Sequence, residues 1–206
     1  EIIMSVIKMN DGIANDQVGD DVVQPFQLES SSLRGRLVRI GPVLDDILVS
    51  HNYPAPVSQL LAESITLSLL LSSMLKYEGV FTLQTSSDGP VPIIVTDVTT
   101  GGNVRSYAKF DEEKLSALPK DASFVDLVGK GYIAFTVDQG KHTDRYQGIV
   151  EMQGKSLQDS IEHYFAQSEQ IGTGIRMAIG NPHETGEGDT PGGWRAGAIM
   201  LQNLPD

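Results

Sequence analysis

Four histidines are the side chains best suited to proton transfer or metal binding, and they lie far apart in the sequence. They are His51, His142, His163 and His183. Histidines that share one metal ion usually recur at a short spacing, such as one helical turn, and no such spacing is present. The chain has no cysteine, which excludes thiolate zinc ligands, disulfide bonds and a cysteine nucleophile within these residues. We therefore expect no metal site and no bound cofactor in this chain.

Carboxylates could supply general acids and bases, but the acidic pairs in this sequence are poorly placed for that chemistry. Asp45 is adjacent to Asp46, and Glu112 is adjacent to Glu113. Adjacent residues do not face each other on a helix, so neither pair predicts an acid/base couple. Glu63 lies within a long apolar segment, where it is either a catalytic acid or a structural carboxylate with a partner, and we favour the structural role. No G-x-S-x-G, P-loop or H-E-x-x-H motif is present. We predict no catalytic residues and a protein that is not an enzyme.

Two short patterns could be taken for phosphate sites. The stretch GTGIRMAIG, residues 172–180, has two glycines of a dinucleotide-binding turn but lacks the third at the required spacing, and it follows a predicted helix. Arg34 and Arg36 form a local basic spot in the run SLRGRLVRI. Apolar and basic residues alternate there with a period of two, which predicts a strand. We interpret the two arginines as the solvated face of that strand rather than as a phosphate site.

The overall charge argues against nucleic acid or an anionic membrane surface as a partner. The 206 residues include 15 Lys and Arg against 27 Asp and Glu, a net charge of -12. A nucleic-acid-binding surface needs a high density of basic residues to neutralise phosphates. The length suits a single domain, and a hydrophobic content of 40% is enough for a sizeable core. No segment has the basic start, apolar stretch and small-residue cleavage site of a secretory signal.

The longest predicted helix runs from about Pro56 to Glu78 and is apolar on nearly every face. Such a helix either spans a membrane or lies at the centre of a protein with other elements packed around it. Gln59, Glu63 and several serines argue against a membrane span. The segment therefore predicts a long buried central helix.

The remaining pattern is mostly hairpins of short strands, with a shorter helix beginning at Pro42 and a capped helix beginning after Ser156. This order predicts an α+β fold, with largely antiparallel sheets packed against helices. Residues 1–25 are predicted to be a flexible N-terminal tail, and residues 26–206 the folded domain. The predicted strands lie at 32–40, 79–85, 91–97, 104–110, 131–140, 145–152, 174–181 and 196–202, the last two joined by an acidic, glycine-rich loop at 184–193.

Several of these segments, taken in order, resemble the core domain of one family, the redox-regulated bacterial heat-shock chaperones of about thirty-three kilodaltons. The resemblance covers roughly residues 26–205. Its most specific parts are the pattern YP-x-P-V-x-x-L-L-A-E, the pattern LQ-x-x-x-DGP that ends at Pro90, and the tetrapeptide RYQG at residues 145–148. Tyr164-Phe165 followed by Ser168-Glu169-Gln170 also matches. Each part is weak alone, but together they indicate this family.

The resemblance implies an ATP-independent holdase of the bacterial cytoplasm that binds unfolding proteins and prevents their aggregation under oxidative or heat stress. It implies a three-layer core of two sheets and helices, and a homodimer. It also implies a helical linker followed by a domain in which four cysteines hold one zinc. Oxidation of those cysteines releases zinc and exposes the client-binding surface. The family's linker begins just after residues 202–205, so we expect a truncated chain in which linker and redox switch are absent. The sequence does not identify which apolar surface binds clients.

The sequence leaves two other functions open. A hydrolase or transferase would use Glu63 or a histidine, and a deep polar pocket containing two or more of Glu63, His51, His142 and the arginines would favour it. An inert dimerisation domain would share every feature of a chaperone core except client binding.

Overall fold

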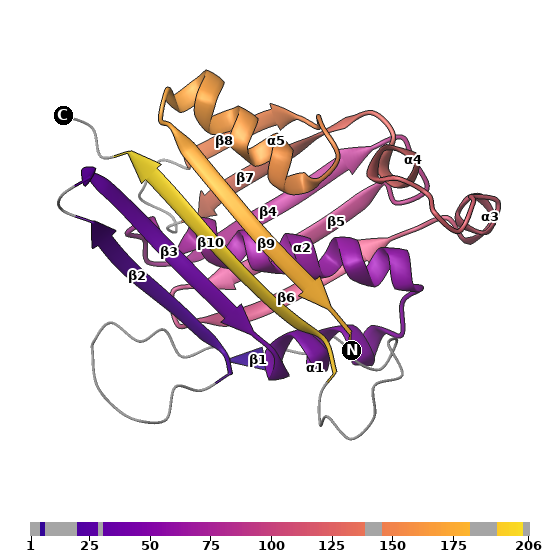
Figure 1. Cartoon of the computed structure of the whole chain (residues 1–206). Helices are drawn as coiled ribbons and strands as arrows, with labels where there is room; N and C mark the ends of the chain where they lie inside the picture. Colours follow the sequence, from indigo (N-terminus) through magenta and orange to yellow (C-terminus); the bar gives the residue numbers. More distant parts are fainter. Residues whose placement is uncertain (1–4, 7–19, 29–30, 139–145, 182–192, 204–206) are drawn as a thin grey trace.

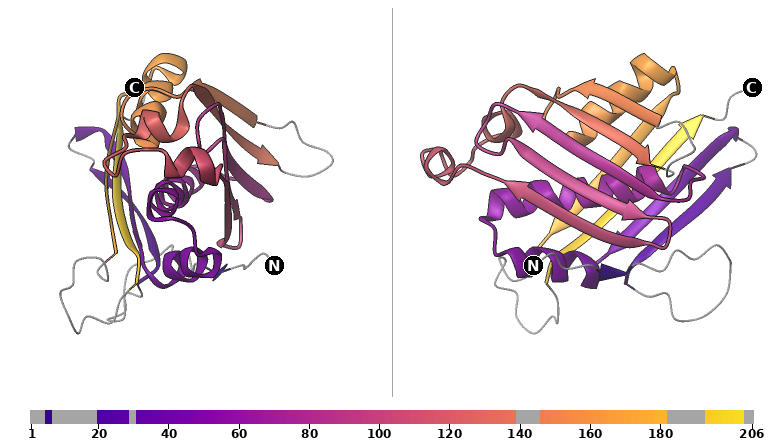
Figure 2. Two further views of the ribbon diagram at one scale, coloured as in Figure 1. Left: turned by 90° about the vertical axis from the view of Figure 1, so that its right-hand side faces the viewer. Right: turned by 180° about the vertical axis from the view of Figure 1, so that it is seen from behind.

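The chain forms three layers, with helices enclosed between two antiparallel sheets (Figures 1 and 2). The computed structural model describes residues 5–6, 20–28, 31–138, 146–181 and 193–203. Within these residues one sheet has six strands in the order β1-β6-β5-β4-β7-β8, and the other has four in the order β2-β3-β10-β9. In the side view of Figure 2 the two sheets stand on opposite sides of the long helix α2. The α+β fold and the three-layer core predicted from the sequence are confirmed.

Most strands lie where the alternation and turn residues predicted them. The Ser-Ser-Asp-Gly-Pro turn at residues 86–90 joins β4 to β5, as the Asp-Gly signal indicates. The strands are β1 (Ser5–Val6), β2 (Val22–Leu28), β3 (Leu33–Ile40), β4 (Val80–Ser87), β5 (Ile93–Thr99), β6 (Asn103–Lys109), β7 (Gly131–Asp138), β8 (Tyr146–Glu151), β9 (Thr173–Gly180) and β10 (Arg195–Asn203).

The helices are capped by side chains close in sequence and by side chains far from them. Ser156 caps α5 by accepting from the Asp159 amide, as the sequence predicted. Helix α1 has no cap of its own, and Asp21 instead accepts from the amides of Gly41 and Val43. The helices are α1 (Pro42–His51), α2 (Ala55–Ser72), α3 (Glu112–Ser116), α4 (Phe124–Val128), α5 (Leu157–Tyr164) and the π-helical turn η2 (Phe165–Glu169).

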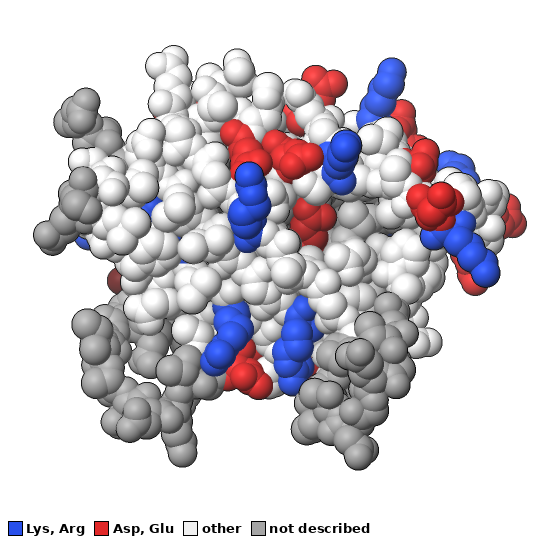
Figure 3. Space-filling model, in the orientation of Figure 1, with Lys and Arg blue, Asp and Glu red and all other residues white. Residues whose placement is uncertain are grey.

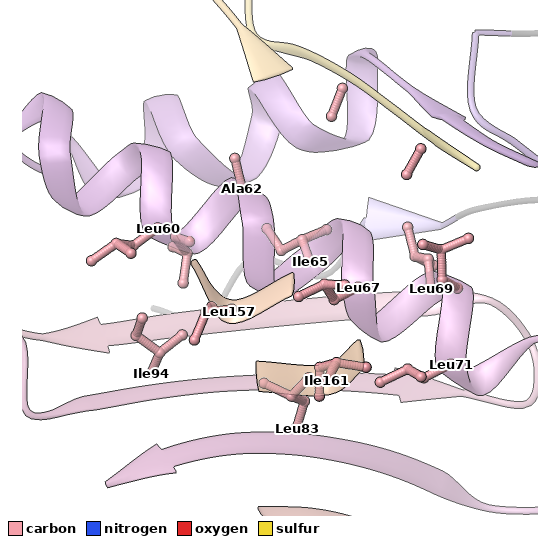
Figure 4. Close-up of a cluster of buried hydrophobic side chains, with 14 of the residues drawn as sticks. Leu60, Ala62, Ile65, Leu67, Leu69, Leu71, Leu83, Ile94, Leu157 and Ile161 are labelled. Carbon is pink, nitrogen blue, oxygen red and sulfur yellow. The ribbon is translucent and has the colours of Figure 1, made fainter. Parts of the chain in front are cut away.

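Helix α2 is buried on every side because both sheets and α5 pack around it. Figure 4 shows its leucines and Ile65 against Leu83 and Ile94 of the six-stranded sheet and Leu157 and Ile161 of α5. Among the described residues it is the one helix long and apolar enough to cross a membrane, yet 78% of it is buried inside the protein. An all-round apolar surface is therefore explained by its position as the core helix.

Buried hydroxyl groups connect α2 to the six-stranded sheet. The hydroxyls of Ser64 and Thr96 lie 2.8 Å apart, and those of Thr96 and Ser106 lie 2.7 Å apart. Within the helix, Thr66 and Ser68 donate to carbonyl oxygens one turn earlier. Because these hydroxyl groups are hydrogen-bonded, their burial costs little free energy. Their small side chains also let the sheet approach the helix closely.

Two predicted boundaries are corrected by the structure. Residues 22–25, predicted as part of the N-terminal tail, belong to β2 and pair with β3, and residues 5–6 pair with β6; the other residues of the predicted tail up to residue 19 lie outside the described part of the chain. Helix α2 ends at Ser72 rather than near Glu78. Ser72 and Ser73 donate to carbonyls of the last turn, and Arg36 donates to the carbonyl of Ser73, which satisfies the helix end there.

The predicted orientation of the arginines on β3 is wrong. Val38 and Ile40 are fully buried, and the period of two places Arg34 and Arg36 on their side of the strand, facing the helical layer. Leu37 therefore points outward and is 45% exposed. Both phases of this strand carry apolar residues, so its pattern did not determine which side faces the core.

Candidate functional site

The outer face of the four-stranded sheet carries a contiguous group of apolar side chains. The strand register places them on the side opposite to the buried Val38 and Ile40. Leu28 and Leu37 are each 45% exposed and Ile199 is 37% exposed, whereas the others are partly buried. We call this surface the outer face, and its residues are Phe26, Leu28, Leu33, Leu37, Ile199 and Leu201.

Cross-strand pairing brings these residues into direct contact with one another. Leu37 lies opposite Ile199, and Leu28 lies opposite Leu33. Gly35 is the partner of both Phe26 and Leu201. A Cβ at Gly35 would lie 2.2 Å from the Phe26 ring, so the absence of a side chain lets that ring lie flat across the strand. These apolar side chains are therefore neighbours on one side of the sheet rather than isolated residues.

Charged residues border the outer face but do not cross its centre. Figure 3 has the orientation of Figure 1, with the four-stranded sheet toward the viewer, and it shows a broad white surface over β2, β3 and β10. Arg39 lies at one end of this face, paired with Asp20, and Arg176 lies across from Ile199 on β9, paired with Glu162. Contiguous apolar patches with a polar border are typical of surfaces that bind other proteins.

Glu63 is hydrogen-bonded to a neighbouring helix, in agreement with the structural role that we favoured from the sequence. Its side chain is buried, and Oε1 accepts a hydrogen bond of 3.0 Å from the Gln158 amide at the start of α5. Burial raises the pKa of the Glu63 carboxyl to about 7, although the amides of Gln158 and Leu157 act in the opposite direction. Glu63 thus joins α2 to α5.

The other residues considered for chemistry are dispersed. Asp45 accepts from the amide of Trp194 at 2.9 Å, which fixes the start of β10 against α1. His51 stacks on Tyr53 with ring centroids 4.9 Å apart, and His163 lies in the last turn of α5. His142, His183 and residues 184–192 of the predicted glycine-rich loop lie outside the described residues. Asp46, Glu112 and Glu113 lie on α1 and α3, and the stretch 172–180 forms strand β9 rather than a dinucleotide turn.

Two hollows in the surface are candidates for the polar pocket that an enzyme would need. One is lined by Arg34, Gly35, Arg36, Met74, Met200 and Gln202. The other is lined by Val80, Asp97, Thr99, Asn103, Val104 and Arg105, and its Asp97 is already paired with Arg105 and Thr82. Neither hollow is lined by Glu63 or His51. The first hollow contains Arg34 and Arg36, but no acidic residue or histidine lines it.

The described residues also provide no metal centre. They contain no group of three or more His, Asp or Glu side chains placed to hold an ion, and the whole sequence has no cysteine. The cysteine-bound zinc implied by the family resemblance therefore does not fit these residues.

Sequence reasoning did not find the outer face. The apolar residues of β3, β10 and β2 were visible, but the sequence does not tell which phase of each strand faces the helices. The one usable signal was Gly35, since a glycine within a strand often marks the close approach of another group. Here that group is the Phe26 ring.

The described residues thus combine a three-layer α+β core with an apolar, charge-bordered sheet face. The sequence model of the Hsp33 protein family matches residues 21–206, and the chain belongs to that family. A 33 kDa chaperonin of Caulobacter vibrioides is 43% identical over 199 residues, covering 94% of this chain and 64% of the relative. One from Photobacterium profundum is 37% identical over 187 residues, covering 91% and 60%.

A solved structure supports the fold independently. The crystal structure of a 33 kDa chaperonin from Thermotoga maritima matches with a TM-score of 0.74 at 20% identity, covering 90% of this chain and 62% of that one. The Caulobacter match covers more of the chain than residues 21–206, so the similarity extends beyond the residues 26–205 that the sequence motifs cover. The chain spans about three fifths of the length of these relatives.

Proposed function

We propose that this chain is the client-binding core of an ATP-independent holdase, and that its outer face holds unfolding proteins through their exposed apolar side chains. The observation that carries this proposal is the outer face itself, because Leu28, Leu37 and Ile199 are large apolar groups kept in solvent on a rigid sheet. Unfolding chains expose the same kind of surface, and association of two apolar surfaces needs no catalytic group. Membership of the Hsp33 family supports the proposal.

The finer properties rest on the family resemblance. Independence from ATP is consistent with the lack of a P-loop in the sequence. Redox regulation during oxidative or heat stress would belong to a zinc-binding cysteine domain beyond these residues, since this sequence has no cysteine. The bacterial cytoplasm and a homodimeric active form are likewise part of the proposal. In the absence of the switch, we expect the outer face to bind clients without an oxidant.

Light scattering of a thermally unfolding test protein, measured without ATP and without oxidant, tests this function. We expect the chain to suppress scattering at a near-stoichiometric ratio. The double variant Leu37→Thr with Ile199→Thr removes two branched aliphatic groups from the outer face while keeping good strand formers. Each group contributes about 1 kcal/mol to apolar contact, so client affinity should fall roughly tenfold or more.

Ile149→Thr is the matched control, because Ile149 is also an exposed strand residue, 58% accessible, but belongs to the six-stranded sheet. This variant should suppress scattering as well as the parent chain. If the parent chain fails to suppress scattering, these residues form an inert scaffold. If the double variant and the control behave alike, clients bind elsewhere on the molecule.

A further inference from the structure

Arg34 and Arg36 lie together in a hollow on the inner side of the four-stranded sheet, where the sequence led us to expect solvent-facing arginines. The hollow is small and open to solvent, and it lies between β3, the end of β10 and the residues that follow α2. Met74 and Met200 form its apolar walls, and Gln202 lies beside Arg34. Both guanidinium groups are thus partly withdrawn from water.

The hydrogen bonds of Arg34 and Arg36 leave at least one guanidinium N–H group without an acceptor among the described residues. Arg34 Nη2 donates to Gln202 Oε1 at 3.2 Å, and Gln202 is itself held by Thr173. Arg36 Nε donates to the carbonyl of Ser73 and Nη1 to that of Gly35, so Arg36 completes the end of α2. Arg34 Nε is buried, and it has no acceptor among the described residues. A buried guanidinium N–H without an acceptor costs free energy, which indicates that a partner belongs there.

The charges in this hollow are also unbalanced. Among the described residues, no carboxylate lies within ion-pair distance of Arg34 or Arg36, whereas Arg39, Arg105 and Arg176 each have one. Burial, followed by the neighbouring charge of Arg34, lowers the pKa of Arg36. The positive charges of Arg34 and Arg36 therefore repel each other. An anion between them would remove their repulsion and accept the free Arg34 Nε–H.

We propose that Arg34 and Arg36 form a binding site for a single oxyanion, a phosphate group or a carboxylate. The planar guanidinium groups match the oxygen geometry of both groups. The site lies on the inner side of the sheet, so it is separate from the outer face and does not depend on client binding.

Nuclear magnetic resonance of the arginine Nε–H groups tests the proposal directly. The full chain is titrated with sodium phosphate, sodium acetate or sodium chloride at matched ionic strength. We expect the Arg34 Nε–H resonance to shift saturably with phosphate, with acetate or with both, while the Arg39 resonance follows ionic strength alone. Saturation by phosphate identifies a phosphate group as the ligand, and saturation by acetate alone identifies a carboxylate. If Arg34 responds to phosphate and acetate no more than to chloride, the proposal is wrong.

Charge-matched variants separate this site from general electrostatics. Arg34→Lys keeps the positive charge but loses the Nε–H and the planar fork, so the oxyanion that saturates the parent chain should bind about tenfold more weakly. Arg39→Lys makes the same change on the opposite side of β3 and should leave that affinity unchanged. Binding is followed by the rise in unfolding temperature with oxyanion concentration. An equal rise in unfolding temperature for Arg34→Lys and for the parent chain would show that the proposed site is wrong.

Discussion

Replacing Glu63 with glutamine should make the protein more stable at neutral and alkaline pH. Glu63 is buried between α2 and α5, and burial raises the pKa of its carboxyl from 4.5 to about 7. The amides of Gln158 and Leu157 favour the charged form, and Asp159 nearby disfavours it. Glutamine keeps a side-chain oxygen for the Gln158 amide, now 3.0 Å from Glu63 Oε1, but cannot ionise.

The direction of the effect follows from proton linkage. Between pH 4.5 and 7 the folded chain keeps a proton on Glu63 that the unfolded chain has released. Stability from this group is therefore fully present below pH 4.5 and is lost as the pH rises through about 7. A difference of about 2.5 in pKa corresponds to about 3 kcal/mol in the free energy of unfolding.

Urea unfolding of the parent chain and of Glu63→Gln at pH 5, 6, 7 and 8 measures this difference. We expect the stability of the variant relative to the parent to increase steadily with pH, by about 2.5 kcal/mol between pH 5 and pH 8. Glu113→Gln, on the short helix α3 where no residue is buried, controls for the loss of one negative charge and should show no such trend. A difference between Glu63→Gln and the parent that stays constant from pH 5 to 8 would refute the reasoning.

Two further substitutions test contacts that hold the layers together. Asp21→Ala removes the acceptor for two amides at the start of α1 and should lower the free energy of unfolding by about 1 to 2 kcal/mol in urea, whereas Asp21→Asn, which keeps one acceptor oxygen, should lose less. Thr96→Val breaks the buried hydroxyl chain from Ser64 to Ser106 and should cost about 1 to 3 kcal/mol by the same measurement. Thr136→Val on β7 is its control; equal losses for the two threonine variants would contradict a role for the hydroxyl chain.

The elements with strong local signals were predictable, whereas those fixed by distant residues were not. The capping serine of α5 and the Asp-Gly turn between β4 and β5 act within a few residues, so the sequence alone indicates them. The cap of α1 comes from Asp21, twenty residues earlier. The end of α2 depends on Arg36 from another strand. Such long-range contacts are invisible to periodicity, and they account for the misplaced helix end.

The orientation of β3 shows why the candidate site escaped sequence analysis. Its outward residues Leu33 and Leu37 and its inward residues Val38 and Ile40 are all apolar. A strand normally reveals its buried side by alternation, but alternation fails when both sides are apolar. The two arginines then suggested the wrong side, because charged groups are usually exposed. Only the position of α2 between the sheets determines which side is covered.

The position of α2 between the sheets also means that the outer face is not needed to complete the core. Helix α2 and the inward side chains of both sheets already form a closed core, so Leu37 and Ile199 contribute little to folding while they face solvent. Single exposed apolar residues are common and need no explanation. Here, however, the apolar side chains pair across neighbouring strands, and Gly35 leaves room for the Phe26 ring between them. An arrangement that adds little to the stability of the core, yet is continuous and bordered by charge, is best explained by contact with another polypeptide.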